Sequence, residues 1–351
     1  MVDEAKLKLF MTKMIADMGA AISVPLIRTG MRLGLYKALD GAGPVTSAEL
    51  AGKTGISERY AREWLAQAAA SGYLTYDPEG HRYELPAEHA LAFARDDSPV
   101  YLGGTVETLA ALYQTQPLVE KAFVSGGGIE WGEHGGCLFC AIGAMLRPRY
   151  AANIVQNWLP ALKGVVTKLQ AGARVADVGC GTGQSTLIMA RAFPNAEFVG
   201  YDFHGPSIEH ARLQARDREG LTNVRFEVAK AKDYPERDLD LVTFFDVLHD
   251  LGDPVGAAAH VRTTLKADGT WMLMEPLAGD STEDNLTPIG RLAYAFSTMA
   301  CVPVSLSQEV GAALGAQAGE RKLTEVIEAG GFRSVRRAAE TPFNMVLEAR
   351  P

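Results

Sequence analysis

Three alternate glycines follow a short apolar segment in the run Val175–Gly183, which reads VADVGCGTG. The segment that leads into the glycines is β-branched and unbroken, which predicts a parallel strand covered on both faces. Glycine has no Cβ, so the turn can bring its backbone against a nucleotide. A helix is expected over residues 184–193. This spacing therefore predicts a nucleotide-binding loop at the end of a buried strand.

A second expected strand, residues 197–202, ends in an acid that can accept hydrogen bonds from both hydroxyls of a ribose. That acid is Asp202, and an aspartate at this place suits a ribose without a 2′-phosphate. The dinucleotide fingerprint G-x-G-x-x-G would need glycine where this chain has Gln184. The loop is thus expected to bind a nucleoside cofactor other than a nicotinamide or flavin dinucleotide.

The loop is the first of an ordered series of motifs, namely VADVGCGTG, EFVGYD, RFEVAKAKDYP, DLVTFFDVLHDLGDP and WMLMEP. In this order they resemble the class I S-adenosylmethionine-dependent methyltransferases over about residues 165–351. The resemblance implies an α/β, Rossmann-like domain whose seven-stranded sheet ends in an antiparallel hairpin, here at 332–338 and 343–349. It also implies S-adenosyl-L-methionine as the cofactor and S-adenosyl-L-homocysteine as its product.

The same resemblance implies a set of cofactor-binding residues, which are Asp177, Gly179, Cys180, Gly181, Asp202, Phe203, Ala231 and Asp246. The glycines would let the methionine portion approach, and Asp246 would shape the methionine end of the site. Asp177 lies inside the first strand, where we expect it to support the loop. The family often has an acid at the position of Lys230 that touches the adenine amino group. The adenine contact is therefore expected from backbone near Ala231.

The candidate catalytic residues follow the fourth expected strand, residues 239–246, at the carboxyl end of the sheet where ligands bind in such folds. The segment there resembles the His-Asp signature of plant-type O-methyltransferases, in which the histidine, here His249, is the general base. Glu275 matches the acid that orients this base, and a carboxylate partner would hold the imidazole tautomer and stabilise its protonated form. The alternative is a histidine that only packs or caps the next helix.

Residues 1–95 are expected to form a separate, mostly helical domain. Apolar residues spaced by three and four give the first helix a stripe, at Leu7, Met11, Met14 and Met18. Two short helices and a hairpin then make a winged-helix pattern, which resembles the N-terminal dimerisation domain of plant and bacterial small-molecule O-methyltransferases. DNA binding is the alternative, but Glu58, Arg59, Arg62 and Glu63 cancel one another in charge on the second short helix. We therefore expect a homodimer through this domain.

Two segments are expected to line the acceptor site. One is the glycine-rich loop at 125–150 within the helical linker 96–163, where His134 is a candidate substrate-loop or catalytic residue. The other is a lid at 280–319 in the methyltransferase domain, 164–351, where Tyr294, Phe296, Met299 and Cys301 would line the site or simply pack. His134, Cys137 and Cys140 have metal-ligand types but no fourth ligand nearby, so no metal is predicted.

The bulk properties fit a two-domain enzyme, with 351 residues, 47% hydrophobic and 22% charged. The net charge of −8 argues against a nucleic-acid partner. We expect no apolar stretch to approach the roughly 20 residues that span a bilayer, so no membrane partner is predicted. The four cysteines are expected as reduced thiols in a cytoplasmic protein.

These observations predict a methyltransferase that acts on a small molecule, at a hydroxyl oxygen. Three alternatives stay open. The acceptor could be nitrogen or sulfur, which need little help from a base. The chain could be a non-catalytic regulator that binds the cofactor and uses its winged helix on DNA. It could also be an enzyme that uses the sulfonium cofactor only electrostatically.

Overall fold

The computed structural model describes the backbone of residues 1–351 and all side chains except those of residues 217–219. The chain folds into two compact units, Met1–Ala110 and Ala111–Pro351. Each unit has its own apolar core. The first unit carries the winged helix, and the second carries the candidate site.

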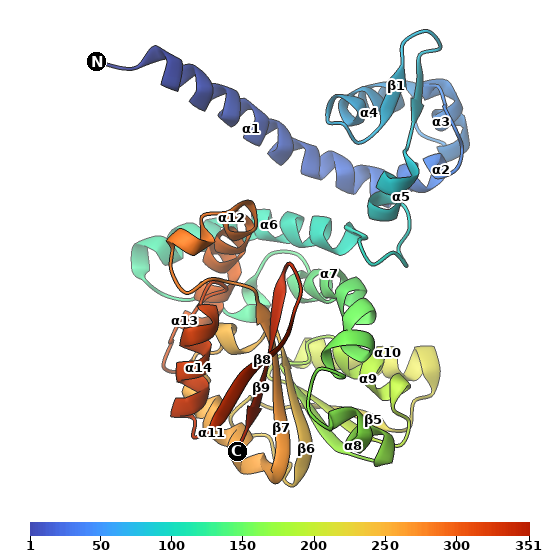
Figure 1. The fold of residues 1–351 in the computed structure, drawn as a ribbon. Coiled ribbons are helices and arrows are strands. Elements are labelled where there is room, and N and C mark those ends of the chain that lie inside the picture. The colour runs from blue at the N-terminus through green and yellow to red at the C-terminus, as the bar shows by residue number, and fades with distance from the viewer. The chain divides into compact units, whose positions relative to one another are not determined.

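The first unit is helical apart from one two-stranded hairpin (Figure 1). Its elements are α1 Glu4–Arg32, α2 Leu35–Leu39, α3 Ser47–Thr54, α4 Glu58–Ala70, β1 Thr75–Asp77, β2 Arg82–Glu84, α5 Ala87–Phe93 and the start of α6 Gly103–Ser125. A capping box starts α3, in which Thr46 accepts from the Glu49 amide and Glu49 accepts from the Thr46 amide. Trp64 on α4 packs edge-on against Tyr36 in the core of this unit. The expected helix, turn, helix and hairpin are confirmed.

Helix α1 leaves many large apolar side chains exposed, including Leu7, Met11 and Met18 of the predicted stripe. Two helical segments, Glu4–Arg32 and Pro288–Leu306, are long and apolar enough to cross a membrane by length and composition alone. The expectation that no stretch approaches such a length is therefore wrong. Helices that pack inside a protein or against a second copy meet the same two criteria, so the finding does not assign a membrane.

The second unit is a seven-stranded sheet in the order β5-β4-β3-β6-β7-β9-β8 with helices on both faces (Figure 1). The strands are β3 Arg174–Val178, β4 Glu197–Asp202, β5 Val224–Val228, β6 Leu239–Phe245, β7 Leu265–Pro276, β8 Ser334–Glu340 and β9 Asn344–Arg350. The first five are parallel, and β9 runs antiparallel to both of its neighbours. The expected Rossmann-like domain with its final hairpin is confirmed.

The helices of this unit alternate with its strands. They are α7 Leu138–Asn153, α8 Val165–Ala171, α9 Gln184–Ala192, α10 Gly205–Glu219, α11 Pro254–Thr264, α12 Pro288–Phe296, α13 Val302–Leu306 and α14 Gly319–Ala329. Two π-helical segments, Ile154–Trp158 and Ser297–Cys301, extend α7 and join α12 to α13. The end of α7 and its π extension lie within the linker that we expected to be helical, 96–163. Pro160 follows, and proline does not continue a helix.

Residues on both faces of the central strands are buried, as their apolar sequences require. Every residue of β6 is buried. On one face the sheet packs against α11 and α14, and on the other against α8, α9 and the π segment after α7. A sheet covered on both faces exposes only the two ends of its strands, so the polar residues at those ends carry whatever chemistry the domain has.

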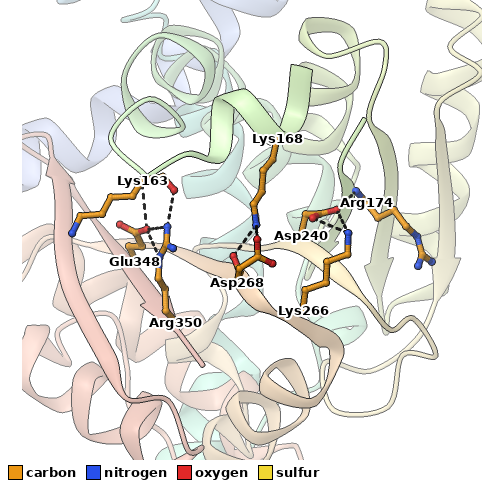
Figure 2. Close-up of polar contacts among 8 residues, drawn as sticks. All are labelled: Lys163, Lys168, Arg174, Asp240, Lys266, Asp268, Glu348 and Arg350. Carbon is orange, nitrogen blue, oxygen red and sulfur yellow. Dashed lines mark hydrogen bonds and ion pairs between the residues drawn. The ribbon is translucent and has the colours of Figure 1, made fainter. Parts of the chain in front are cut away.

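At the amino ends of the parallel strands, two lysines are paired with acids (Figure 2). Lys266 Nζ lies 2.8 and 2.9 Å from the two oxygens of Asp240, which also accepts from the Arg174 amide. Lys168 on α8 bonds to Asp268 at 2.7 Å. These contacts fasten the strand ends and α8 together, and most of the charged groups are partly exposed to water.

Candidate active site

The glycine loop after β3 turns in a conformation that only its glycines adopt easily. Gly179 and Gly181 have φ values of 71° and 53°. A Cβ on Gly179 would lie 2.5 Å from Cγ2 of Val247, whereas no described atom lies within 4 Å of a Cβ built on Gly181. The loop is therefore closed on the Val247 side and open beside Gly181, where a ligand can approach the backbone.

Asp177, in the strand that precedes this loop, stabilises it. Its fully buried carboxylate accepts hydrogen bonds from Ser185 and Thr186 at the start of α9, at 2.7 and 2.6 Å, and from Thr243 on β6 at 2.8 Å. Burial raises the pKa of Asp177, and the three hydroxyl donors oppose that shift. Because both oxygens already have donors, Asp177 acts by holding β3, β6 and α9 in register around the loop.

Asp202 ends β4 beside the open side of the loop. It accepts from the amides of Gly181 at 2.9 Å and His204 at 2.8 Å. Burial raises its pKa to about 6, although these two amides oppose the shift. The carboxylate is thus buried with only two neutral donors, and further donors such as a pair of ribose hydroxyls would stabilise its charge.

His204 also lies in this region, although the sequence analysis did not select it as a site residue. Its amide bonds to Asp202, and its ring packs edge-on against Phe139 of α7 with ring centroids 4.9 Å apart. The position two residues after the strand-ending acid was the signal that could have placed it. Phe203, between the two, is 46% exposed and is available to pack against a flat ring.

The other predicted cofactor residues occupy different surroundings. The Cys180 side chain is buried in a small cluster with Leu187, Ile208, Ala211 and Phe226, and burial raises its pKa well above the usual value. Ala231 is half-buried against the sheet core. Lys230, at the place where an acid was expected, donates its amide to Asp233. Cys180 therefore packs, while the segment around Ala231 presents backbone.

Asp246 follows β6 with a left-handed φ of 56°, a conformation that is uncommon for a residue with a side chain. Its amide donates to the Met274 carbonyl at 2.7 Å. Burial raises the pKa of its carboxyl to about 7, and the charge of Glu275 adds to that shift while His249 opposes it. A half-buried carboxyl with a raised pKa is suited to receive a cation.

His249 and Glu275 form a direct pair at the carboxyl ends of β6 and β7. His249 Nδ1 lies 2.6 Å from Glu275 Oε2, and both residues are buried. The other oxygen of Glu275 accepts from the amides of Val247 and Leu248 at 3.2 and 2.8 Å. Glu275 is therefore fixed by the turn that carries His249, and it orients the imidazole through Nδ1.

A second carboxylate, that of Asp250 in the same His-Asp segment, lies close to the other ring nitrogen of His249 without a hydrogen bond to it. His249 Nε2 lies 3.1 Å from Asp250 Oδ1. Burial lowers the pKa of His249, but the charges of Asp250 and Glu275 outweigh burial and raise it well above the usual value. The two acids therefore favour the protonated form of the imidazole.

The lid segment is bonded onto this turn. Ser305 Oγ donates to the Leu251 carbonyl at 2.8 Å, and the Gln308 side-chain amide donates to the Asp250 carbonyl at 2.9 Å. Ligand-type atoms of His249, Asp250 and Cys301 lie within 4.8 Å of one another. Burial raises the pKa of the Cys301 thiol to about 12, so Cys301 is an uncharged side chain beside the histidine. Three further predicted lid residues, Tyr294, Phe296 and Met299, are half-buried.

His134 is buried after the 3₁₀ turn Trp131–Glu133, with 5% of its surface exposed. Neither ring nitrogen has a hydrogen-bond partner among the described residues. Burial lowers its pKa, while the charge of Asp250 opposes that shift. The histidine is thus neutral, lies within the field of Asp250, and has hydrogen-bonding capacity left for a ligand.

Cys137 and Cys140 are joined by a disulfide, which corrects the expectation that all four cysteines are reduced thiols. Cys180 and Cys301 are free and buried. The pair stands at the start of α7, three residues from each other, where a helical turn brings such side chains to one side. A glycine-rich loop was expected over 125–150, but the structure has helix α7 from Leu138.

Comparison with known proteins assigns two parts of the chain. Residues 169–331 match a family described as "Methyltransferase domain", and residues 20–95 match the "Rv2258c-like winged HTH domain". Trans-aconitate 2-methyltransferase of Methylobacterium radiotolerans is 30% identical over 166 residues, which are 47% of this chain and 56% of that protein. The chain thus spans about half the length of this relative.

Two solved structures share the whole architecture. A protein of Nostoc punctiforme, provisionally assigned as an O-methyltransferase, aligns with a TM-score of 0.74 and 22% identity over 98% of both chains. Human N-acetylserotonin methyltransferase in complex with SAM aligns with a TM-score of 0.71 and 18% identity over 99% of this chain and 98% of that one. At these identities the likeness shows the shared fold.

Proposed function

We propose that this chain, which belongs to the methyltransferases through its 169–331 domain, uses S-adenosylmethionine to methylate a small molecule at an ionisable oxygen. The observation that carries this proposal is that two sets of residues lie at the carboxyl ends of the strands. Asp202 and the glycine loop form one set, and His249 with Glu275 forms the other. The structural relatives that are named as O-methyltransferases support the choice of oxygen.

The residues fit this cofactor. Asp202 is a buried carboxylate whose two present partners are backbone amides, and its side of the loop is open at Gly181. Asp246, with its pKa near 7, would receive the ammonium of the methionine portion. The exposed ring of Phe203 would pack on the adenine. When bound, the cofactor supplies a methyl group on a sulfonium, already activated for in-line attack.

The protonated imidazole of His249 bears on how the acceptor is activated. Nδ1 is occupied by Glu275, so only Nε2 can face an acceptor, and Nε2 now faces Asp250. An acceptor hydroxyl that enters between Nε2 and Asp250 would weaken this ion pair and lower the pKa of the imidazole. His249 would then release its Nε2 proton to water, and the free nitrogen could accept the proton of the acceptor hydroxyl. In this proposal His249 is the general base, Glu275 orients it, and Asp250 competes with the acceptor for it.

A second role for His249 is favoured by the same observation. A histidine that stays protonated would bind an acceptor that is already an anion, such as a carboxylate or phenolate, and would remove no proton. The relative named trans-aconitate 2-methyltransferase points to this class of acceptor. The two roles predict opposite responses to pH, because a base acts only when deprotonated and a cationic binder only when protonated.

His134 supports an acceptor that carries a polar group. Its ring nitrogens lack partners among the described residues although the side chain is 95% buried. A buried polar group without a partner costs stability, so such a group is retained where a ligand completes it. We place His134 opposite His249 on the acceptor, as a binding residue in the segment that leads into α7.

The N-terminal unit is proposed to dimerise and not to bind DNA. On α4 the cations that would meet phosphates are paired within the helix, Arg62 with Glu58 and Arg59 with Glu63, both at 2.6 Å. The exposed apolar side chains of α1 need a cover. We expect a chain without residues 1–20 to be a monomer or to aggregate in light scattering. A stable full-length monomer would refute this, and co-sedimentation with lipid vesicles would favour a membrane instead.

The decisive experiment is a methyl-transfer assay on the purified chain with labelled S-adenosylmethionine and panels of phenols, carboxylic acids, amines and thiols. We expect turnover with an oxygen acceptor and strong dependence on His249. Turnover with a thiol or amine that does not depend on His249 would move the protein to the S- or N-methyltransferases. Cofactor binding with no turnover on any panel, together with binding to duplex DNA, would favour the regulatory alternative.

A further inference from the structure

The Cys137–Cys140 pair has the position of a thiol and disulfide exchange site. Cys137 is the residue that caps the start of α7, and Cys140 lies in the first turn of this 16-residue helix. Cys137 is exposed and Cys140 is half-buried. The positive end of the helix favours a thiolate at this place, and C-x-x-C in a protein of a reducing compartment is typical of redox or metal chemistry.

The turn that carries the pair is packed on the candidate acceptor site on one side. His134 is only three residues before Cys137. The amide of Gly135 donates to Thr115 Oγ1 of α6 at 2.9 Å, and a Cβ on Gly135 would lie 2.4 Å from Cβ of Gln114. The connection from His134 to the disulfide is therefore short and closely packed, so a change at Cys137 reaches His134 directly.

On its other side the turn is packed on the cofactor loop. Phe139, between the two cysteines, lies edge-on to His204 beside Asp202. One turn further along α7, a Cβ on Gly143 would lie 2.3 Å from Oγ1 of Thr182 in the glycine loop. The disulfide thus lies in a segment that touches both the cofactor loop and the acceptor histidine, and its Cys137 side is exposed.

We propose that Cys137 and Cys140 form a reversible redox site that exchanges with small thiols and disulfides and sets how firmly the start of α7 holds the cofactor loop. Reduction begins when a thiolate RS⁻ attacks Sγ of exposed Cys137. The Cys137–Cys140 bond breaks, its electron pair leaves on Cys140 Sγ, and a mixed disulfide remains on Cys137. A second thiol then attacks the mixed disulfide, so two RSH give RSSR and the protein dithiol. Oxidation by RSSR is the reverse.

The consequence for turnover rests on the proposed function, whereas the exchange itself does not. The disulfide restricts the first turn of α7 before any ligand arrives, so less ordering is needed when the cofactor binds. We expect the oxidised chain to bind S-adenosylhomocysteine about three- to tenfold more tightly than the reduced chain. Release of this product would then be faster in the reduced state.

The first measurement is alkylation of the full chain after equilibration in glutathione buffers of varied ratio, read by mass spectrometry. We expect Cys137 and Cys140 to pass together from protected to labelled, and Cys140→Ser to trap glutathione on Cys137. Two thiols that stay labelled at every ratio would overturn the proposal. One equivalent of zinc bound tightly to the reduced pair would also overturn it, because the cysteines would then be metal ligands.

The second measurement is the affinity for S-adenosylhomocysteine by calorimetry, with and without reductant. The matched control is Cys137→Ser with Cys140→Ser, which should bind as the reduced chain does and ignore reductant. Equal affinities in both states of the wild-type chain would refute the coupling to the cofactor loop. Absence of binding in either state, with normal thiol exchange, would refute the proposed function and leave the exchange site standing.

Discussion

Charged side chains are paired and hydrated at one end of the sheet and are more deeply buried at the other. At the amino ends of the strands, Lys266 and Lys168 meet acids directly, and most of these groups remain in contact with water. At the carboxyl ends, Asp202 is buried and Asp246 is half-buried, the pKa of both carboxyls is raised, and His249 lies between two acids. Paired, hydrated charges stabilise the fold. Buried charges that lack enough hydrogen-bond donors or counter-charges indicate where a ligand binds.

The largest effect that separates the two ends is expected from His249→Asn. If His249 removes the acceptor proton, asparagine should lower kcat about 10²- to 10⁴-fold at unchanged cofactor affinity. The matched change at the amino end is Lys266→Met, which should leave kcat unchanged and alter the free energy of unfolding by at most about 1 kcal/mol. Steady-state kinetics and denaturant unfolding test both. Comparable losses of kcat in the two variants would contradict the comparison.

Asp202→Asn should act on cofactor binding with a smaller effect. The amide keeps the size of the side chain but loses the charge that strengthens its bonds to hydroxyl donors, which corresponds to about 1.5–3 kcal/mol, or roughly 10- to 150-fold in Kd for S-adenosylmethionine. Calorimetry measures it. Asp240→Asn at the amino end is the control and should leave that Kd unchanged. Wild-type affinity in Asp202→Asn would remove Asp202 from the cofactor site.

Cofactor affinity should also depend on pH through Asp202, whose pKa is about 6. Below that pH the carboxyl is protonated, so we expect affinity to fall by up to about tenfold per pH unit as pH decreases. The chain without cofactor should respond with the opposite sign. A carboxyl whose pKa is raised on folding stabilises the folded state at low pH, and this contribution is lost as pH rises through about 6. Calorimetry and unfolding across pH 5–8 test both signs.

The smallest change is expected from Asp250→Asn, which removes one of the two acids that hold His249 protonated. The pKa of His249 should fall, because the charge of Asp250 makes the largest of the contributions that raise it. If His249 is a base, the rising limb of the rate against pH should move to lower pH. If His249 binds an anionic acceptor as a cation, the falling limb should move to lower pH instead. A profile that does not move would exclude coupling between Asp250 and His249.

Much of the sheet end could be predicted from the sequence, because local pattern determines it. The glycines at 179 and 181 require the turn, and the strands that end at Asp202 and Phe245 are apolar and short. The pairing of His249 with Glu275 was expected from the resemblance, and the structure places the two atoms 2.6 Å apart. Their roles in catalysis stay predictions.

Other features depend on contacts between distant segments, which no local pattern records. The approach of Asp250 to Nε2 is set by a 3₁₀ turn and by lid bonds from residues more than fifty positions away. The position of His204 follows from the packing of α7, whose start was read as loop because of its glycines. The Cys137–Cys140 bond was missed because the cysteines were weighed as metal ligands or free thiols only.

The three hydroxyls that converge on Asp177 have a kinetic consequence. They hold the cofactor loop in its working shape before any ligand is present, so arrival of the nucleoside requires little rearrangement there. Association should then vary little among variants of this half of the site, and differences in affinity should be found in residence times. A substitution such as Thr243→Val would loosen the loop and slow association itself. The association rate therefore distinguishes a preorganised site from one that forms only when its ligand binds.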